Sequence, residues 1–296
     1  MTDKNSPAAP PSPEAAADKK GEALKQQRFR MLEDIAREMS SDDIVFPTCF
    51  DAVLRIRDAL KDPEVSIQKV IALVRTEPLI CARLLQLANS AVQGVREEIR
   101  DVGTAVQRLG LNAVRNAAMT VAMAQLVRSK ALLPFNSLSR ALWLHSLYAA
   151  AAAEVIAAEM SRVSPDEALF AGLVHDLGAF YMLYRAAQYD ELRVRPDTVR
   201  HLIMQWHQDI GESLLYALKL PDGLIEALRN HDQARPPLLD PARKLGEVVY
   251  AANVLASTEF AWVESEEDEP RELGAEFHAL KPRIDERFAQ IKSDFG

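Results

Sequence analysis

The sequence predicts an all-α protein, and three observations lead to that prediction. Apolar residues recur at intervals of three and four positions along most of the chain, which is the period of a helix face. No window alternates apolar and polar residues with a period of two, and β-branched residues are not clustered as they are in strands. Several apolar stripes also begin at a helix-start signal, such as Ser164-Pro165-Asp166-Glu167.

Composition indicates a globular chain whose partners are not nucleic acids. The 296 residues are 48% hydrophobic and 26% charged, which is enough apolar material for a sizeable core. The formal net charge is −8, the wrong sign for general attraction to phosphate backbones. We therefore expect no nucleic-acid partner.

The cysteines and the N-terminus bear on the cellular compartment. The sequence has two cysteines, Cys49 and Cys81, each beside apolar residues, which favours buried thiols in a reducing environment over a disulfide framework. The first residues lack the pattern of a secretory signal, and no uninterrupted apolar run approaches a bilayer-spanning length. We expect a cytoplasmic protein with no membrane partner.

The first half of the chain divides into a tail and a series of helices. Residues 1–22 are mostly Pro, Ala, Ser and charge, so they are predicted to be disordered. Start signals at Ser66 and Pro78 open two short helices, and Gly110 is predicted to stop a third. Asn89 and Ser90 are predicted to cap backbone groups at a helix end. Helices are predicted over about 23–40, 50–60, 67–74, 78–91, 102–109 and 112–127.

The second half contains a long helix from Ser137 or Ser139 to Met160. Its run of alanines, 149–153, allows a neighbouring helix to approach closely. The acidic run 264–269 is predicted to be a solvated linker before a last helix. Further helices are predicted from 165, then over about 179–188, 197–218 with a break near Gln208, 221–231, 240–258 and 272–292.

The segment from Ala171 to Phe180 carries a His175-Asp176 pair among small and apolar residues. A buried aspartate costs several kcal/mol unless a cation or hydrogen-bond donors meet it. Gly178 is predicted to end the helix, which would place the pair near a helix C-terminus. The pair has two interpretations: an aspartate that fixes a core histidine, or two metal ligands.

Further histidines favour the metal interpretation when they are taken together. His145, His207 and His231 fall on or near successive predicted helices, and helical bundles build metal sites by projecting one ligand inward from each of several helices. Each histidine alone is more typical of a core or surface residue. Imidazole with carboxylate suits a single Fe, Mn, Zn or Ni ion better than Ca or Mg. The candidate metal ligands are His145, His175, Asp176, His207 and His231, whereas His201 and His278 lie in polar surroundings and are left out.

The ordered motifs identify a family resemblance. The chain resembles HDOD proteins, bacterial signalling-output relatives of the HD-type metal-dependent phosphohydrolases, over about residues 41–257. The resemblance implies an HD-like helical bundle with an additional N-terminal helical lobe. The chain is accordingly divided into a tail at 1–22, lobes at 23–136 and 137–258, and a linker with a final helix at 259–296. The motifs are 46–63, Leu84-Leu-Gln-Leu-Ala-Asn-Ser-Ala91, Ala105-Val-Gln-Arg-Leu-Gly110, Leu142-Trp-Leu-His145-Ser, 171–178 and 220–231.

The resemblance also shows where this chain departs from the catalytic relatives. His145 and the His175-Asp176 pair match their ligands, and His207 and His231 match loosely, but Asn253 stands where a closing aspartate is expected. The Gly-Tyr-Pro signature of cyclic-dinucleotide phosphodiesterases is absent after His231. With Asp176 as the one evident carboxylate, a two-metal hydrolase is not expected, because bridging carboxylates normally offset the metal charge.

These observations lead to one preferred function and two alternatives. The preferred function is a non-catalytic signal-transduction output module that binds a protein partner or a small ligand, including a nucleotide-type ligand, with no catalytic residue assigned. The alternatives are an HD-type phosphohydrolase acting on a nucleotide or cyclic dinucleotide, with Lys219 and Arg229 as available cations, and a purely structural helical scaffold. The sequence contains no receiver, sensor or cyclase domain, so we expect the signal to arrive through another chain. The N-terminal tail and the last helix are the predicted contacts for that chain.

Overall fold

The computed structural model confirms the all-α prediction. It describes residues 13–41, 48–60, 62, 64–90, 99–218, 220–233, 235–236, 238, 242–262 and 272–293. Within these ranges there is no β-strand, and the one extended pairing is an isolated bridge between Leu238 and Leu273. The Phe46-Pro47 motif, Lys219 and the acidic run 264–269 lie outside the described residues.

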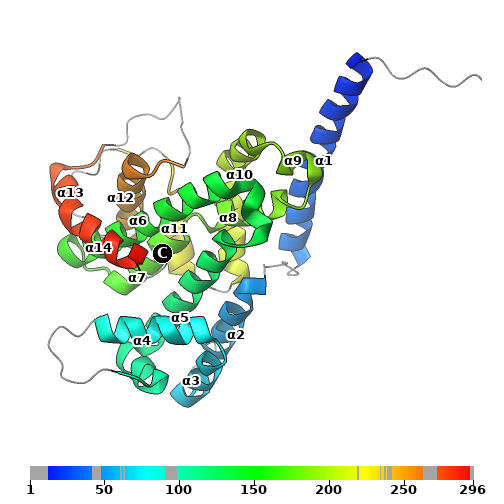
Figure 1. The fold of residues 1–296 in the computed structure, drawn as a ribbon. Helices are drawn as coiled ribbons and strands as arrows, with labels where there is room; N and C mark the ends of the chain where they lie inside the picture. The colour runs from blue at the N-terminus through cyan, green and yellow to red at the C-terminus, as the bar shows by residue number, and fades with distance from the viewer. Residues whose placement is uncertain are drawn as a thin grey trace, which may run out of the picture.

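Helices α2, α3 and α4 pack against the long kinked helix α5 in the first half of the chain. The elements of this half are α1 (Pro13–Ser41), a 3₁₀ turn (Thr48–Phe50), α2 (Asp51–Leu60), α3 (Ile67–Arg75), α4 (Pro78–Ser90) and α5 (Val102–Val127). Gly110 has φ of 81°, and it kinks α5 where the sequence predicted a stop. Figure 1 shows α2, α3 and α4 gathered around the first part of α5, with α1 apart from them.

The second half is built around α6, which α7, α12 and α14 cover, while α8 packs against α10. The described elements are a 3₁₀ turn (Lys130–Phe135), α6 (Asn136–Met160), α7 (Pro165–Val174), α8 (Leu177–Ala186), α9 (Asp190–Arg193), α10 (Pro196–Ala217), α11 (Asp222–Leu228), α12 (Leu245–Glu259), α13 (Ala275–Ala279) and α14 (Lys281–Ser293).

Predicted capping residues occupy the expected positions. The Ser66 side chain accepts a hydrogen bond from the backbone N–H of Lys69 at 3.3 Å, as an N-cap does. Ser164 stands at the N-cap of α7 and Pro165 at its first position, although the Ser164 side chain makes no cap hydrogen bond. Asn89 donates to the backbone oxygen of Ile99 and accepts from its N–H, so its backbone-capping role is confirmed.

Two helix boundaries differ from the prediction. Helix α1 begins at Pro13 rather than near residue 23, because the Glu- and Ala-rich stretch after that proline is a good helix former. Helix α10 continues through Gln208 without a break, since no glycine or proline interrupts it before Gly211.

The terminal helices pack against the second half of the chain. Helix α1 contacts α9 and α10, and Tyr181 and Arg185 hydrogen-bond to its Glu38. Helix α14 packs on α6, with Ile284, Phe288 and Ile291 buried and Arg287 paired with Glu154. The apolar side of the last helix is therefore buried within its own chain.

The structure shows how far the two cysteines and the apolar segment Lys130–Met160 are buried. Cys49 and Cys81 are free and partly buried. The segment Lys130–Met160 is long and apolar enough to cross a membrane, and 72% of its apolar window is buried inside the protein. Such burial is typical of the central helix of a folded domain.

Candidate metal centre

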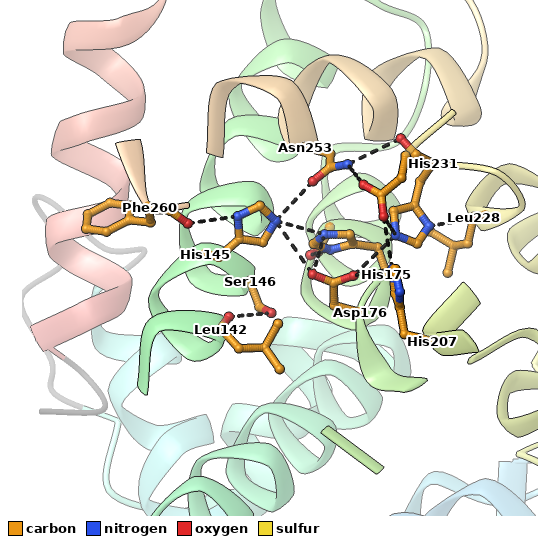
Figure 2. A network of polar contacts seen from close by, with 12 residues as sticks. Leu142, His145, Ser146, His175, Asp176, His207, Leu228, His231, Asn253 and Phe260 are labelled. Carbon is orange, nitrogen blue, oxygen red and sulfur yellow. Dashed lines mark hydrogen bonds and ion pairs between the residues drawn. The ribbon is translucent and has the colours of Figure 1, made fainter. Parts of the chain in front are cut away.

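The structure brings all five predicted ligands together on one point. His145 comes from α6, His175 and Asp176 from the junction between α7 and α8, His207 from α10, and His231 from just after α11. The four histidines and Asp176 are each 1–3% exposed. Figure 2 shows Asp176 between His145 and His175 on one side and His207 and His231 on the other. His201 and His278, which were left out, are exposed.

Two glycines allow the helices to approach this closely. A Cβ on Gly172 of α7 would lie 2.6 Å from the backbone oxygen of Ala149 in the alanine run of α6. A Cβ on Gly178 of α8 would lie 2.0 Å from the backbone oxygen of His207 in α10. Gly178 thus lies inside the first turn of a helix and does not end one, contrary to the prediction. Its role is to let α8 and α10 meet beside Asp176.

Backbone carbonyls orient all four histidine rings. The Nδ1 atoms of His145, His175, His207 and His231 lie 3.1, 2.8, 2.8 and 2.9 Å from the backbone oxygens of Phe260, Gly172, Ile203 and Leu228. A carbonyl can only accept, so these contacts place the proton of each neutral ring on Nδ1. The Nε2 lone pairs then face the centre. Histidines that bind metals are held in this way by their other ring nitrogen.

The first donor group consists of His145, His175, Asp176 and Asn253. His145 Nε2 lies 3.2 Å from His175 Nε2, 3.0 Å from Asn253 Oδ1 and 3.6 Å from Asp176 Oδ2. The Asn253 amide is held with its oxygen inward, because its Nδ2 donates to the Asp232 carboxylate and to the backbone oxygen of His231. A neutral His145 ring has one N–H proton, and the backbone oxygen of Phe260 accepts it at Nδ1. No proton is then left for the acceptors that face Nε2. A cation among the four inward atoms would satisfy them.

The second donor group consists of Asp176, His207, His231 and Asp232. Asp176 Oδ1 lies 3.2 Å from His231 Nε2 and 3.5 Å from His207 Nε2, while Asp232 Oδ2 lies 2.9 Å from His207 Nε2. One ligand atom from each of these four residues falls within 4.8 Å of the others, and the same holds for His145, His175 and Asp176. Asp176 therefore serves both groups, one through each carboxylate oxygen. The donor chemistry of both groups fits a transition metal.

The pKa of His145 in the first group and those of His207 and His231 in the second group are shifted in opposite directions. Burial lowers the pKa of His145 to about 4, although Asp176 opposes this. Burial also acts to lower the pKa values of His207 and His231, but the adjacent Asp232 and Asp176 carboxylates raise both overall. Burial acts to raise the pKa of Asp176, yet His175, His231 and His207 hold it well below its usual value.

Asp232 is the functional residue that the sequence analysis missed. It follows His231 directly, at the place where the sequence analysis noted only that the Gly-Tyr-Pro signature is absent. His231 and His207 bring its pKa below the usual value despite its burial, so it is a second anion in the centre. A His-Asp dipeptide repeated at 175–176 and 231–232 was the available signal. The argument that one carboxylate excludes two metals therefore loses its premise.

The described surroundings of the centre are narrow and acidic. A cavity of about 20 Å³ lies beside His175 and His231, which is room for roughly one water molecule. Asp209 and Glu212 line it, and Glu212 pairs with Arg229. The side chain of Asp232 is 27% exposed, so it is the ligand in contact with solvent. Arg229, an expected phosphate-binding cation, is thus already neutralised.

Comparison with known proteins places the geometry in a family. The HDOD domain model matches residues 46–234. An uncharacterised protein from Treponema pallidum is 28% identical over 222 residues, which is 70% of this chain and 41% of the relative, so the chain spans less than half of that protein.

Solved structures share the fold. A candidate metal-dependent phosphohydrolase from Shewanella amazonensis superposes with a TM-score of 0.65 at 19% identity, covering 92% of this chain and all of its own. An HDOD domain protein of unknown function from Geobacter sulfurreducens gives a TM-score of 0.58 at 24% identity, covering 88% of this chain and 97% of its own. At these identities the likeness is one of fold.

Proposed function

We propose that this chain, which belongs to the HDOD domain family, is a non-catalytic signal-transduction output module whose histidine–aspartate centre holds one transition-metal ion. The observation that carries the proposal is the convergence of four Nε2 atoms on Asp176 in a closed site. The ion stabilises the arrangement of the helices that carry its ligands, and a protein partner in a signalling pathway reads that arrangement.

The second donor group is the better place for the ion. Asp176 and Asp232 supply two negative charges beside His207 and His231, whereas the first group pairs Asp176 with the neutral amide of Asn253. Carboxylates bind divalent cations more strongly than a neutral amide does, because they offset the charge that burial makes costly. When bound, the ion would supply the charge that the inward-facing acceptors lack.

The residues of the second donor group, together with Asn253, connect five helices: α7, α8, α10, α11 and α12. Asp176 joins the α7–α8 junction to α10 through His207, and His231 adds the segment after α11. Asn253 ties α12 to the same point by donating to Asp232. A ligand set drawn from separate elements couples metal binding to folding, because the site forms only when the elements meet.

The described surroundings favour binding over hydrolysis. Phosphohydrolysis needs space for the substrate and cations that stabilise the transferred phosphate. The cavity beside His175 and His231 holds about 20 Å³, and its lining includes Asp209 and Glu212. Acidic side chains in a narrow site repel a phosphate ester.

A turnover assay tests this proposal. The full chain, loaded in turn with Mn, Fe, Zn and Ni, is incubated with bis(p-nitrophenyl) phosphate, GTP and a cyclic dinucleotide. We expect no product above that formed by the Asp176→Ala variant. Multiple turnovers by the wild type that disappear in Asp176→Ala would overturn the non-catalytic assignment.

One observation favours a second candidate, a metal-dependent phosphohydrolase. Asp176 faces both donor groups and Asp232 adds a second carboxylate, which is the charge pattern that a two-metal hydrolase requires. Two ions per chain together with turnover of a phosphodiester would establish this candidate. One ion per chain without turnover would support the output module.

A further inference from the structure

A second cavity lies away from the metal centre, between the two halves of the chain. Its volume is about 370 Å³, within the range of pockets that take small molecules. Helices α2 and α5 form one side, and α7 with the α10–α11 connection forms the other. Most of its lining is apolar, including Val53, Ile56 and Phe170.

Arg115 places a positive charge at the wall of this apolar cavity. Its guanidinium carbon lies 4.6 Å from the centroid of the Phe170 ring, so the cation is stacked on one wall. Its buried Nε atom has no hydrogen-bond partner, and the guanidinium makes no hydrogen bond or ion pair with a described residue. Burial lowers its pKa, which Glu167 partly offsets. A buried donor without a partner is unfavourable unless a ligand or water meets it.

The second arginine of the cavity differs because it is already paired. Arg57 donates to the backbone oxygen of Ala217 at 3.0 Å and to the Asp58 carboxylate at 2.7 Å. It therefore links α2 to the end of α10 and leaves Arg115 as the cation available to an occupant. One planar guanidinium matches one carboxylate or one phosphate group.

We propose that this cavity binds a small amphiphilic anion, with an oxyanion on Arg115 and an apolar body against Val53, Ile56 and Phe170. The occupant also lies against Leu218 and Pro221, which belong to the connection between α10 and α11. Helix α10 carries His207 and α11 leads to His231, so the occupant contacts a segment that positions two metal ligands. No described residue lines both this cavity and the small cavity beside the metal centre.

Isothermal titration calorimetry with matched probes tests the proposal. Octanoate and octyl phosphate carry the two oxyanions, and octanol is the neutral probe of equal chain length. We expect at least one anion to bind the full chain at least about 10-fold more tightly than octanol, since charge-assisted hydrogen bonds are the stronger ones. The preferred anion identifies the head group. Equal binding of all three probes, or binding of none, overturns the proposal.

Variants assign the preference to Arg115. Arg115→Met keeps an apolar stem and should reduce the affinity for the anion to that for octanol, while Arg115→Lys should retain part of the preference. Arg108→Met is the control, because Arg108 is exposed on the same helix and does not line the cavity. A preference that persists in a folded Arg115→Met protein overturns the assignment. The result does not depend on the metal, since the titration is repeated after chelation.

Discussion

The two donor groups that share Asp176 differ in their number of carboxylates and in the pKa values of their histidines. The group of His145, His175 and Asn253 surrounds Asp176 with inward-facing acceptors, and burial keeps His145 neutral by lowering its pKa to about 4. The group of His207, His231 and Asp232 has a second carboxylate, and the adjacent Asp232 and Asp176 raise the pKa values of both histidines against the effect of burial. Asp176 therefore faces one group in which burial dominates the pKa of His145 and another in which the carboxylates dominate the pKa values of His207 and His231.

The two groups also differ in the oxygen ligand that each adds to Asp176: an amide in the first and a carboxylate in the second. A carboxylate oxygen binds a divalent cation more strongly than an amide oxygen does, so we expect the second group, with Asp232, to be a stronger metal site than the first group, with Asn253. The four predictions below test the comparison in order of expected effect.

Replacing the shared ligand should have the largest effect on metal binding. Asp176→Asn removes one negative charge from both groups with little change in volume. We expect the affinity for a transition metal to fall at least about 100-fold, more than the loss caused by an outer partner. Metal-competition titration measures the affinity, and the exposed Asp197→Asn is the control. Unchanged affinity would mean that the ion lies elsewhere.

Separating the helices beside Asp176 should have the largest effect on stability. Gly178→Ala places a Cβ against the backbone oxygen of His207, and backbone atoms cannot yield as a flexible side chain can. We expect the free energy of unfolding to fall by about 3 kcal/mol. Urea denaturation of the metal-free protein measures it.

Gly223→Ala is the matched control, because no atom lies within 4 Å of a Cβ at that position of α11. It should change stability by less than about 1 kcal/mol. Equal losses in the two variants would show that close packing of α8 on α10 is unimportant.

Removing a carboxylate from the second donor group alone should show how much of the metal affinity depends on that group. Asp232→Asn removes the second carboxylate but leaves an oxygen to accept from Asn253. We expect metal affinity to fall on the order of 10- to 100-fold. Asp209 is exposed on α10 and lines the small cavity beside His175 and His231. The control variant Asp209→Asn should leave the metal affinity unchanged. The comparison fails if the two variants weaken binding equally.

Strengthening the first group should raise the number of ions bound. Asn253→Asp gives that group a second carboxylate, and we expect the stoichiometry in excess Mn to rise from about one to about two ions per chain. The same change brings two carboxylates together at Asp232, so the metal-free variant should be less stable than the wild type. Asn253→Ala should bind no second ion. Elemental analysis and thermal melting measure the two effects.

The sequence predicted the fold and the five side chains that meet at the candidate centre better than it predicted the reasons for their positions. Helical periodicity and start signals such as Ser66 and Pro165 are local, so they could be recognised without knowledge of the packing. The role of Gly178 depends on which helix crosses it, and no local pattern carries that information. Its preference for ending helices was therefore the wrong explanation.

The candidate site shows the same limit. His145, His175, Asp176, His207 and His231 were selected as a set, and they do meet. The second His-Asp dipeptide, which contains Asp232, was passed over, and its contacts with His207 and Asn253 depend on how α10 and α12 pack. The final helix was predicted as a contact for partners, and this stays a prediction: Ile284 and Ile291 are buried, so the exposed side of α14 is the part available for that contact. Tertiary packing decides which amphipathic faces remain available.

The most direct test of the account is elemental analysis of the purified full chain, prepared without chelator and without added metal. We expect about one transition-metal ion per chain, retained through gel filtration and removed only by a strong chelator with a fall in melting temperature. A wild-type protein that holds no transition metal, even after incubation with Mn, Fe, Zn and Ni, and that melts at the same temperature with and without them, would contradict it.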